Sequence, residues 1–270
     1  MPGIRTQQDG SVLTVTIDRP DRLNALDVPS MHSLRLALEA AAQETKLRAV
    51  VLRGEGRAFC AGGDVATMEE HRRAGTLPQL FHDLTGEQEL AIRAIVGMPK
   101  PVLASLAGVA AGGGLALALA ADWRIAAEEA VLVPAFSRLG AVPDGGLTYF
   151  LPHFLGLGGA QELLFSDAKV PAARARELGL VHEVVPAGQL ADRTRARAEE
   201  LANGPTFAYG WLKQLLVSAF HESLAHQLAL ERKGAVQATE QGELSEGISA
   251  FREKRPPRFG PPSGGSTRTT

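Results

Sequence analysis

The stretch PVLASLAGVAAGGGLALALAAD, residues 101–122, carries no ionisable side chain before its final aspartate. Its first part, 102–106, is apolar as in a short buried strand, and 115–121 is apolar on every side, as in a buried helix. A glycine triplet at 112–114 separates the two. Glycines allow another molecule to approach the main chain closely, and the first N–H groups of a helix have no partner inside it. The junction is therefore predicted to bind an anion or a developing oxyanion.

Three other interpretations of this stretch compete with an oxyanion site, and the sequence weighs against the first two. Its length approaches the roughly 20 apolar residues of a membrane span, although glycines, alanines and a serine make it a poor one. A phosphate-binding loop needs Gly-Lys-Ser/Thr after its glycines, and Leu115 and Ala116 stand there instead. A purely structural turn into a core helix fits the pattern as well as an oxyanion site does.

Composition restricts the class of protein. The chain has 270 residues, of which 45% are hydrophobic and 21% charged, with a formal net charge of -2. These values are typical of a globular protein and give no reason to expect a nucleic-acid or membrane-surface partner. Cys60 is the only cysteine, which excludes a disulfide framework, and its apolar neighbours favour a packed rather than a reactive thiol. The histidines lack ligand spacing, so no metal site is expected.

Strands alternate with helices over roughly the first 190 residues, which indicates an α/β class. Helical patterns then follow at 188–203, 206–220, 223–241 and 243–254. We therefore divide the chain into a core at 1–190, a helical region at 191–255 and a disordered tail at 256–270. The N-terminus lacks the apolar core of a signal peptide, which predicts a cytoplasmic protein.

One internal segment is predicted to be irregular. Asp64 has the position of an N-cap for a helix at 65–73. Residues 74–87 contain two glycines and a proline, so we expect a loop with broken helix there, covering a site. A helix is predicted again at 87–96.

Six motifs occur in order along the chain: RPDRLNALD (19–27), FCAGGD (59–64), AGVAAGGGLALALAAD (107–122), LGAVPDGG (139–146), ELGLVHEVVP (177–186) and EGISAFREKRPPRF (246–259). Together they resemble the enoyl-CoA hydratase/isomerase, or crotonase, superfamily over nearly the whole chain. The resemblance implies a crotonase-like spiral of ββα units with a helical C-terminal trimerisation region. It also implies a homotrimer or dimer of trimers and an acyl-CoA thioester substrate, with no cofactor beyond the coenzyme A of the substrate.

The resemblance further implies site residues. Members of the superfamily hold the thioester carbonyl with two backbone N–H groups, which here are those of Gly63 and Gly113. Glycine suits such positions because no Cβ shields the amide. A Phe and a Lys of the C-terminal helix often complete the adenine pocket, although EGISAFREK also fits an amphipathic docking helix. The positions that would contact substrate or coenzyme A are Arg22, Leu23, Ala25, Ala61, Gly62, Asp64, Gly112, Phe251 and Lys254.

The reaction type depends on three positions. Hydratases of the superfamily carry two catalytic glutamates, and Ala116 and Ala135 occupy those places. Asp144 instead lies in the motif VPDGG, which resembles the ring-epoxide and enoyl-CoA isomerases of phenylacetate degradation. Apolar surroundings raise the pKa of such an aspartate and make it a better base. The sequence thus predicts that Asp144 moves a proton of a 3-enoyl-CoA from the α- to the γ-carbon, giving the 2-enoyl-CoA.

Other functions are open. Asp144, between proline and glycine, also fits a turn or an N-cap. A hydratase would need another acid or base, for which we consider the region from Glu69 to Asp83. A dehalogenase-type nucleophile would need a His and a Trp where Glu89 and Phe136 stand. A non-catalytic acyl-CoA-binding protein is the fourth alternative. The acyl group and the choice between trimer and hexamer are not fixed by the sequence.

Overall fold

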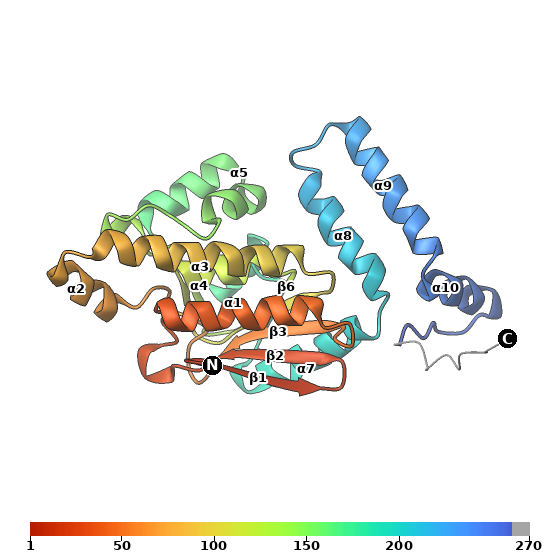
Figure 1. Ribbon diagram of the computed structural model, residues 1–270, viewed down its shortest axis with the longest axis horizontal. Coiled ribbons are helices and arrows are strands. Elements are labelled where there is room, and N and C mark those ends of the chain that lie inside the picture. The colour runs from red at the N-terminus through yellow and green to blue at the C-terminus, as the bar shows by residue number, and fades with distance from the viewer. Residues whose placement is uncertain (261–270) are drawn as a thin grey trace.

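The computed structural model describes residues 1–260 and is built on a six-stranded sheet in the order β1-β2-β3-β4-β6-β9 (Figure 1). Strand β1 is antiparallel to β2, and the other neighbours in this sheet are parallel. A second sheet has the order β5-β7-β8. The strands are β1 (Ile4–Asp9), β2 (Val12–Ile17), β3 (Ala49–Gly54), β4 (Val102–Leu106), β5 (Val109–Ala111), β6 (Trp123–Ala127), β7 (Val131–Val133), β8 (Val170–Pro171) and β9 (Glu183–Val185).

Both faces of the central strands are covered, which explains their uninterrupted apolar sequences. Successive side chains of a strand point to opposite faces. In β3, Val50 and Leu52 face the main core with helices α1 and α3, whereas Val51 packs with Ala198 and Ala202 of α7. The predicted strand at 102–106 is confirmed at the same residues as β4.

The chain also forms helices on both sides of the sheet and beyond it (Figure 1). They are α1 (Val28–Gln43), α2 (Val65–Ala74), α3 (Leu77–Gly97), α4 (Gly113–Ala120), α5 (Leu147–Ser166), α6 (Ala172–Glu177), α7 (Leu190–Ala202), α8 (Thr206–Ser218), α9 (Leu224–Thr239) and α10 (Gly242–Glu253), with short 3-10 turns η1 (Pro20–Arg22), η2 (Ser137–Leu139) and η3 (Ala187–Gln189). The four predicted C-terminal helices correspond to α7–α10. No helix among residues 1–260 is both long and apolar enough to cross a membrane.

Helices α8–α10 stand away from the sheet, and we call them the arm (Figure 1). Because α7 packs on the sheet, the arm begins with α8 at Thr206 and not at residue 191. The arm carries apolar side chains that are more than half exposed. These are Leu212, Leu216, Phe220, Leu224, Leu228, Val236, Ile248 and Phe251.

Two polar anchors join the arm to the core. The Lys213 ammonium lies 2.7 Å from an Asp122 carboxylate oxygen and donates to the carbonyls of Ile95 and Lys100 at 3.0 and 3.1 Å. At the other end, Arg48 lies 3.0 Å from a carboxylate oxygen of Glu243 in α10. The orientation of the arm is therefore set by charged groups and not by a shared apolar core.

The prediction of an irregular loop at 74–87 is wrong, because α3 runs without a break from Leu77. Gly75 ends α2 with a φ of 71°, and Pro78 lies in the first turn of α3, where a missing N–H costs nothing. Gly86 lies inside the helix at a cost of about 1 kcal/mol relative to alanine. Buried side chains such as Leu84 and Ile95 offset that cost by packing on the core.

The C-terminal tail falls mostly outside the described residues. Of the segment 256–270, for which we predicted disorder, 261–270 are not described. Within 256–260, the Arg258 amide donates to Glu246 at 2.7 Å.

Candidate active site

The glycine triplet lies where β5 turns into α4. Gly112 has a φ of 52° and donates its amide to the Val133 carbonyl at 3.1 Å. Gly113 begins α4, whose eight residues are all buried. Within residues 1–260, no acceptor bonds the amide of Gly113. This amide also lies at the positive end of a helix dipole, so it is suited to an oxyanion.

A second free amide comes from the loop before α2. Its neighbours in 61–64 all have acceptors, whereas the Gly63 N–H has none in the part of the chain that the structure describes. The bonds that hold the loop run from Ala61 N to Leu23 O (3.0 Å), from Gly62 N to Cys60 Sγ (3.4 Å) and from Asp64 N to Leu26 O (3.0 Å). The loop is thus fixed on both sides of one unpaired donor.

The two free amides border the same cavity. The Ala111 amide donates to the Cys60 carbonyl at 2.9 Å, which joins the two loops. A Cβ placed on Gly62 would lie 3.4 Å from the nitrogen of Gly113. Both Gly63 and Gly113 line a cavity of about 400 Å³. Two backbone donors on one cavity match the requirement for holding a carbonyl oxygen that gains negative charge.

The close approach of the loops leads to a test at Gly62. This residue has a φ of 93°, and an alanine Cβ would lie 2.8 Å from the Ala111 carbonyl oxygen. We expect Gly62→Ala to be destabilising and to lower the turnover by at least about tenfold, because the loop must shift and carry the donor with it. Gly10→Ala is the matched control, since Gly10 also has a positive φ but nothing within 4 Å of the added Cβ. Equal urea midpoints for the two variants would contradict the close approach.

The Asp144 carboxylate lines the same cavity. Asp144 precedes α5, but the N-cap of that helix is Gly146 and no side chain caps it. The carboxylate instead accepts a hydrogen bond from the side-chain amide of Gln88 at 3.3 Å. Burial raises the pKa of Asp144, and the hydrogen bond from Gln88 opposes this in part. The backbone of Asp144 thus forms a turn, as one interpretation of the sequence held, whereas its side chain lines the cavity.

Apolar groups from α2, α3 and the η2 segment form most of the cavity wall. They are Met68, Leu77, Phe81, Leu84, Phe136, Leu139 and Ala141. Apart from Asp144, the ionisable residues that line it are Glu69 and Arg72. Arg72 and Arg73 donate to Glu69 and lower its pKa to about 2. So acidic a group is a weak base at neutral pH, which disfavours Glu69 as the second acid or base considered above.

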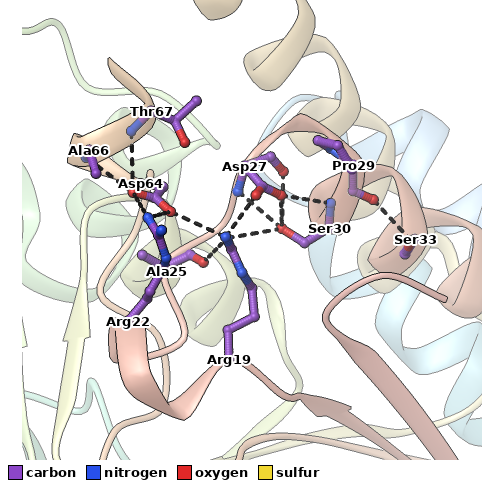
Figure 2. A network of polar contacts seen from close by, with 10 residues as sticks. All are labelled: Arg19, Arg22, Ala25, Asp27, Pro29, Ser30, Ser33, Asp64, Ala66 and Thr67. Atoms are coloured by element: carbon purple, nitrogen blue, oxygen red, sulfur yellow. Dashed lines mark hydrogen bonds and ion pairs between the residues drawn. The ribbon is translucent and has the colours of Figure 1, made fainter. Parts of the chain in front are cut away.

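The Asp64 side chain is fully engaged inside the protein (Figure 2). It caps α2, as predicted, by accepting from the amides of Ala66 and Thr67 at 3.1 and 3.4 Å. It also accepts from Arg22 at 2.9 Å and Arg19 at 3.2 Å. The carboxylate has no free side for coenzyme A, so its role is to hold the loop that carries Gly63.

Arg19 extends this network to the start of α1 (Figure 2). It lies 2.7 Å from the Asp27 carboxylate and donates to the Ala25 carbonyl at 2.5 Å. Asp27 caps α1 by accepting from Ser30. The motif at 19–27 is therefore clamped to the loop beside the cavity.

The other predicted binding residues divide into two groups. Ala61, Gly62 and Gly112 line the cavity, and the half-exposed Arg22 and the Leu23 carbonyl lie beside its loop. Ala25 is buried and does not line the cavity; its carbonyl accepts a hydrogen bond from Arg19 and its amide donates to the Arg22 carbonyl. Phe251 is 86% exposed near the end of α10, where Lys254 is the C-cap. Figure 1 shows α10 far from α2, so one chain does not bring these two residues to the cavity.

Gln88 is the site residue that the sequence analysis missed. Its side chain lines the cavity, yet the residue is only 4% exposed. It belongs to the apolar stripe of α3 formed by Leu84, Ala91 and Ile95. A glutamine within the apolar stripe of a helix is the sequence signal that could have identified this site residue, because a buried side-chain amide requires a hydrogen-bond partner.

Two further expectations concern reactive groups. Cys60 is buried, and burial raises its pKa to about 12, which confirms a packed thiol. Residues 1–260 contain no cluster of three or more His, Cys, Asp or Glu side chains suited to a metal ion. The disfavoured alternative of a membrane span at 101–122 is excluded, because the stretch folds as β4, β5 and α4 inside the core.

Known proteins are similar to this chain in sequence along almost their whole length. The family described as enoyl-CoA hydratase/isomerase matches residues 7–262. A probable enoyl-CoA hydratase of Rhodobacter capsulatus is 39% identical over 95% of this chain and 97% of its own. The 1,2-epoxyphenylacetyl-CoA isomerase of Escherichia coli is 37% identical over 96% of this chain and 98% of its own.

Solved structures agree with the sequence comparisons. A putative enoyl-CoA hydratase/isomerase from Mycobacterium abscessus has a TM-score of 0.90 and 32% identity, covering 96% of this chain and all (100%) of its own. An enoyl-CoA hydratase from Polaromonas sp. JS666 has a TM-score of 0.89 and 35% identity, covering 94% and 98%. These likenesses confirm the predicted crotonase-type α/β fold. By its sequence, its fold and the paired amides of its cavity, the chain belongs to the enoyl-CoA hydratase/isomerase family.

Proposed function

We propose that this protein is an enoyl-CoA isomerase that converts a 3-enoyl-CoA into the conjugated 2-enoyl-CoA. The observation that carries the proposal is one cavity that combines two unpaired backbone amides with a single partly desolvated carboxylate. Isomerisation needs one group that first accepts and then returns a proton. Asp144 meets that requirement alone.

The proposed mechanism has two steps. The thioester oxygen accepts hydrogen bonds from the amides of Gly63 and Gly113, and Asp144 takes a proton from C2. The C2–H electrons form a C1=C2 bond and the carbonyl π electrons move to the thioester oxygen, which gives a dienolate that keeps its C3=C4 bond. Asp144 then delivers the proton to C4: the C3=C4 electrons form the new C4–H bond, the C1=C2 electrons move to C2=C3, and the carbonyl reforms. Donors already in place stabilise the developing charge, and each one is worth about a hundredfold or more in rate.

The two positions of the hydratase glutamates support isomerisation over hydration. Ala116 is fully buried, and a Cβ on Gly145 would lie 2.7 Å from the Cβ of Ala116. A glutamate at 116 would need this occupied space. Ala135 lines the cavity with a φ of 60°, a conformation that side chains with a Cβ rarely adopt. Neither position supplies a carboxylate that could activate water.

The relatives support both chemistries. The Escherichia coli relative is named as an isomerase of an epoxide thioester, which favours double-bond or ring rearrangement. The Rhodobacter capsulatus relative is named as a probable hydratase, which makes hydration the alternative.

Parallel assays of the purified protein would test the proposal. We expect the absorbance of the conjugated thioester to rise with a 3-enoyl-CoA and to stay flat with a 2-enoyl-CoA. A falling signal with the 2-enoyl-CoA would show hydration and contradict the mechanism. No change with either substrate, together with binding of the acyl-CoA, would identify a non-catalytic binding protein.

We further propose a cytoplasmic homotrimer or dimer of trimers in which the arm is the interface. Its exposed apolar side chains favour burial against other copies. Phe251 and Lys254 lie on this arm and remain candidates for the adenine pocket in the assembly. Light scattering on the purified protein should give three or six copies, and a monomer would contradict the proposal.

A further inference from the structure

We propose that Gln88 is a positioning residue for proton transfer: its side-chain amide holds Oδ1 of Asp144, so that Oδ2 exchanges protons with the substrate. The inference deepens the proposed isomerase function and rests on it. The roles of the oxyanion amides and of the general base do not explain why the polar side chain of Gln88 is buried beside the cavity. The inference gives that side chain a role.

The position of Gln88 on α3 indicates a function beyond packing. Leu84 and Ala91, its neighbours at helical spacing, are buried and apolar. Burying an amide costs free energy unless it is hydrogen-bonded. A leucine or methionine would fill the same position without that cost. The polar group is therefore explained by its partner, the carboxylate of Asp144.

The Gln88 amide also touches both segments that carry the reacting groups. A Cβ on Gly113 would lie 2.7 Å from Gln88 Oε1, and a Cβ on Gly145 would overlap Gln88 Nε2. The amide thus lies between the start of α4, which supplies an oxyanion donor, and the loop that carries the base. One planar group sets the separation of the two, and such positioning is worth large factors in rate.

The hydrogen bond is directed at one oxygen of the carboxylate. Nε2 of Gln88 donates to Oδ1 of Asp144 at 3.3 Å. This bond holds Oδ1, whereas Oδ2 has no hydrogen-bond donor within residues 1–260 and is the oxygen that accepts and returns the proton. A neutral donor suits this task, because an Arg or Lys would hold the carboxylate in its charged form and weaken it as a base.

Few other charges act on Asp144. Glu69 and Arg72 of α2 line the same cavity but pair with each other at 2.6 Å. Helix α4 contributes Gly113 to the wall, and the segment 135–141 contributes only apolar residues. On α5, Tyr149 contacts His153 and His221 and does not line the cavity. A change at Gln88 is therefore expected to act on Asp144 directly.

The first experiment follows Asp144 without requiring activity. Carbon-13 NMR of the aspartate carboxyls, with Asp144→Asn for assignment, gives the pKa of Asp144 in the free protein. We expect Gln88→Leu to raise it, because burial remains and the opposing hydrogen bond is lost. Gln88→Glu should give a two-step titration, since two adjacent carboxylates titrate as a pair. The matched control is Gln79→Leu, which removes an exposed glutamine of α3 that donates to Asp83 at 2.8 Å.

The second experiment measures proton transfer. We expect Gln88→Leu to lower kcat about tenfold with KM within twofold, and to move the acid limb of kcat/KM to higher pH. In deuterium oxide, the fraction of the C2 proton found at C4 should fall, because a mobile carboxylate exchanges with solvent. Gln79→Leu should leave all three readouts unchanged. Circular dichroism checks that the variants are folded.

The outcomes separate the two proposals. If the wild type isomerises but Gln88→Leu keeps its acid limb, NMR titration and proton return unchanged, the role of Gln88 is overturned and the isomerase function stands. If the wild type does not isomerise, the proposed function fails, and with it the part of Gln88 in proton transfer. The NMR titration then shows separately whether Gln88 holds the carboxylate.

Discussion

Asp144→Asn is expected to lower kcat/KM for a 3-enoyl-CoA by about a thousandfold or more. A general base contributes roughly 10²–10⁴ in rate, and here one group serves as both base and acid. Asparagine keeps the size of the side chain and a carbonyl oxygen that can still accept from Gln88, so the cavity should persist. Initial rates with the same substrate and enzyme concentration provide the measurement.

The control for this variant is binding. Affinity for an unreactive saturated acyl-CoA should change by less than about threefold, because the amides of Gly63 and Gly113 remain. Activity within tenfold of the wild type would place the base elsewhere. Loss of binding together with activity would indicate a collapsed cavity and not a missing base.

The raised pKa of Asp144 also predicts the pH dependence. The base must be ionised, so kcat/KM falls as the pH drops through the pKa, which burial holds above the ordinary value of 3.8. The effect of the same pKa on stability has the opposite sign. Because the pKa is raised in the folded state, the carboxyl favours folding at low pH, where it is protonated. It disfavours folding at a pH at which it is ionised in both the folded and the unfolded protein. We therefore expect Asp144→Asn to melt slightly higher than the wild type at neutral pH, as is common for catalytic residues.

Lys213→Met is expected to be strongly destabilising, by about 3 kcal/mol, since it removes the buried partner of an ion pair whose carboxylate is only partly exposed. The Lys213 side chain is only 9% exposed and bonds one carboxylate and two carbonyls. Its loss would leave the Asp122 carboxylate with a hydrogen bond from the Val102 amide and the charge of Arg124, but without its paired ammonium. Urea denaturation at neutral pH measures the effect.

A second variant and a change of pH distinguish this cause from lost packing. In Lys213→Met the folded state should bind a proton at Asp122, so its stability deficit should shrink as the pH falls toward 4. Adding Asp122→Asn should recover most of the loss at neutral pH, because the uncompensated charge is gone. A double variant no more stable than Lys213→Met would assign the effect to the methylene stem of the lysine.

The fold was predictable where the sequence pattern is local. The buried strand at 102–106 and the four C-terminal helices follow from runs of apolar residues and their spacing. Strand β1 was not predicted, because five of its six residues are exposed and it depends on pairing with β2. The continuous α3 was missed because Gly86 and Pro78 weaken its pattern, while the packing that offsets them is long-range.

The same distinction applies to the site. Gly63, Gly113 and Asp144 were identified because each belongs to a motif, and the structure places all three on one cavity. Gln88 belongs to no motif, and its meaning comes only from meeting Asp144 across 56 residues of sequence. Asp64 was predicted both as a cap and as a ligand contact. Sequence alone could not show that Arg19 and Arg22 occupy the same carboxylate.

The backbone origin of the two free amides has a consequence for how this protein could change its chemistry. Because Gly63 and Gly113 polarise the thioester through the main chain, no side-chain replacement elsewhere deletes a donor. The reaction outcome is therefore separable from carbonyl activation and resides in the few side chains that face the acyl carbons. A library restricted to positions 88, 135 and 144 would sample new acid–base arrangements on an unchanged electrophilic centre, which makes this cavity a practical starting point for directed evolution.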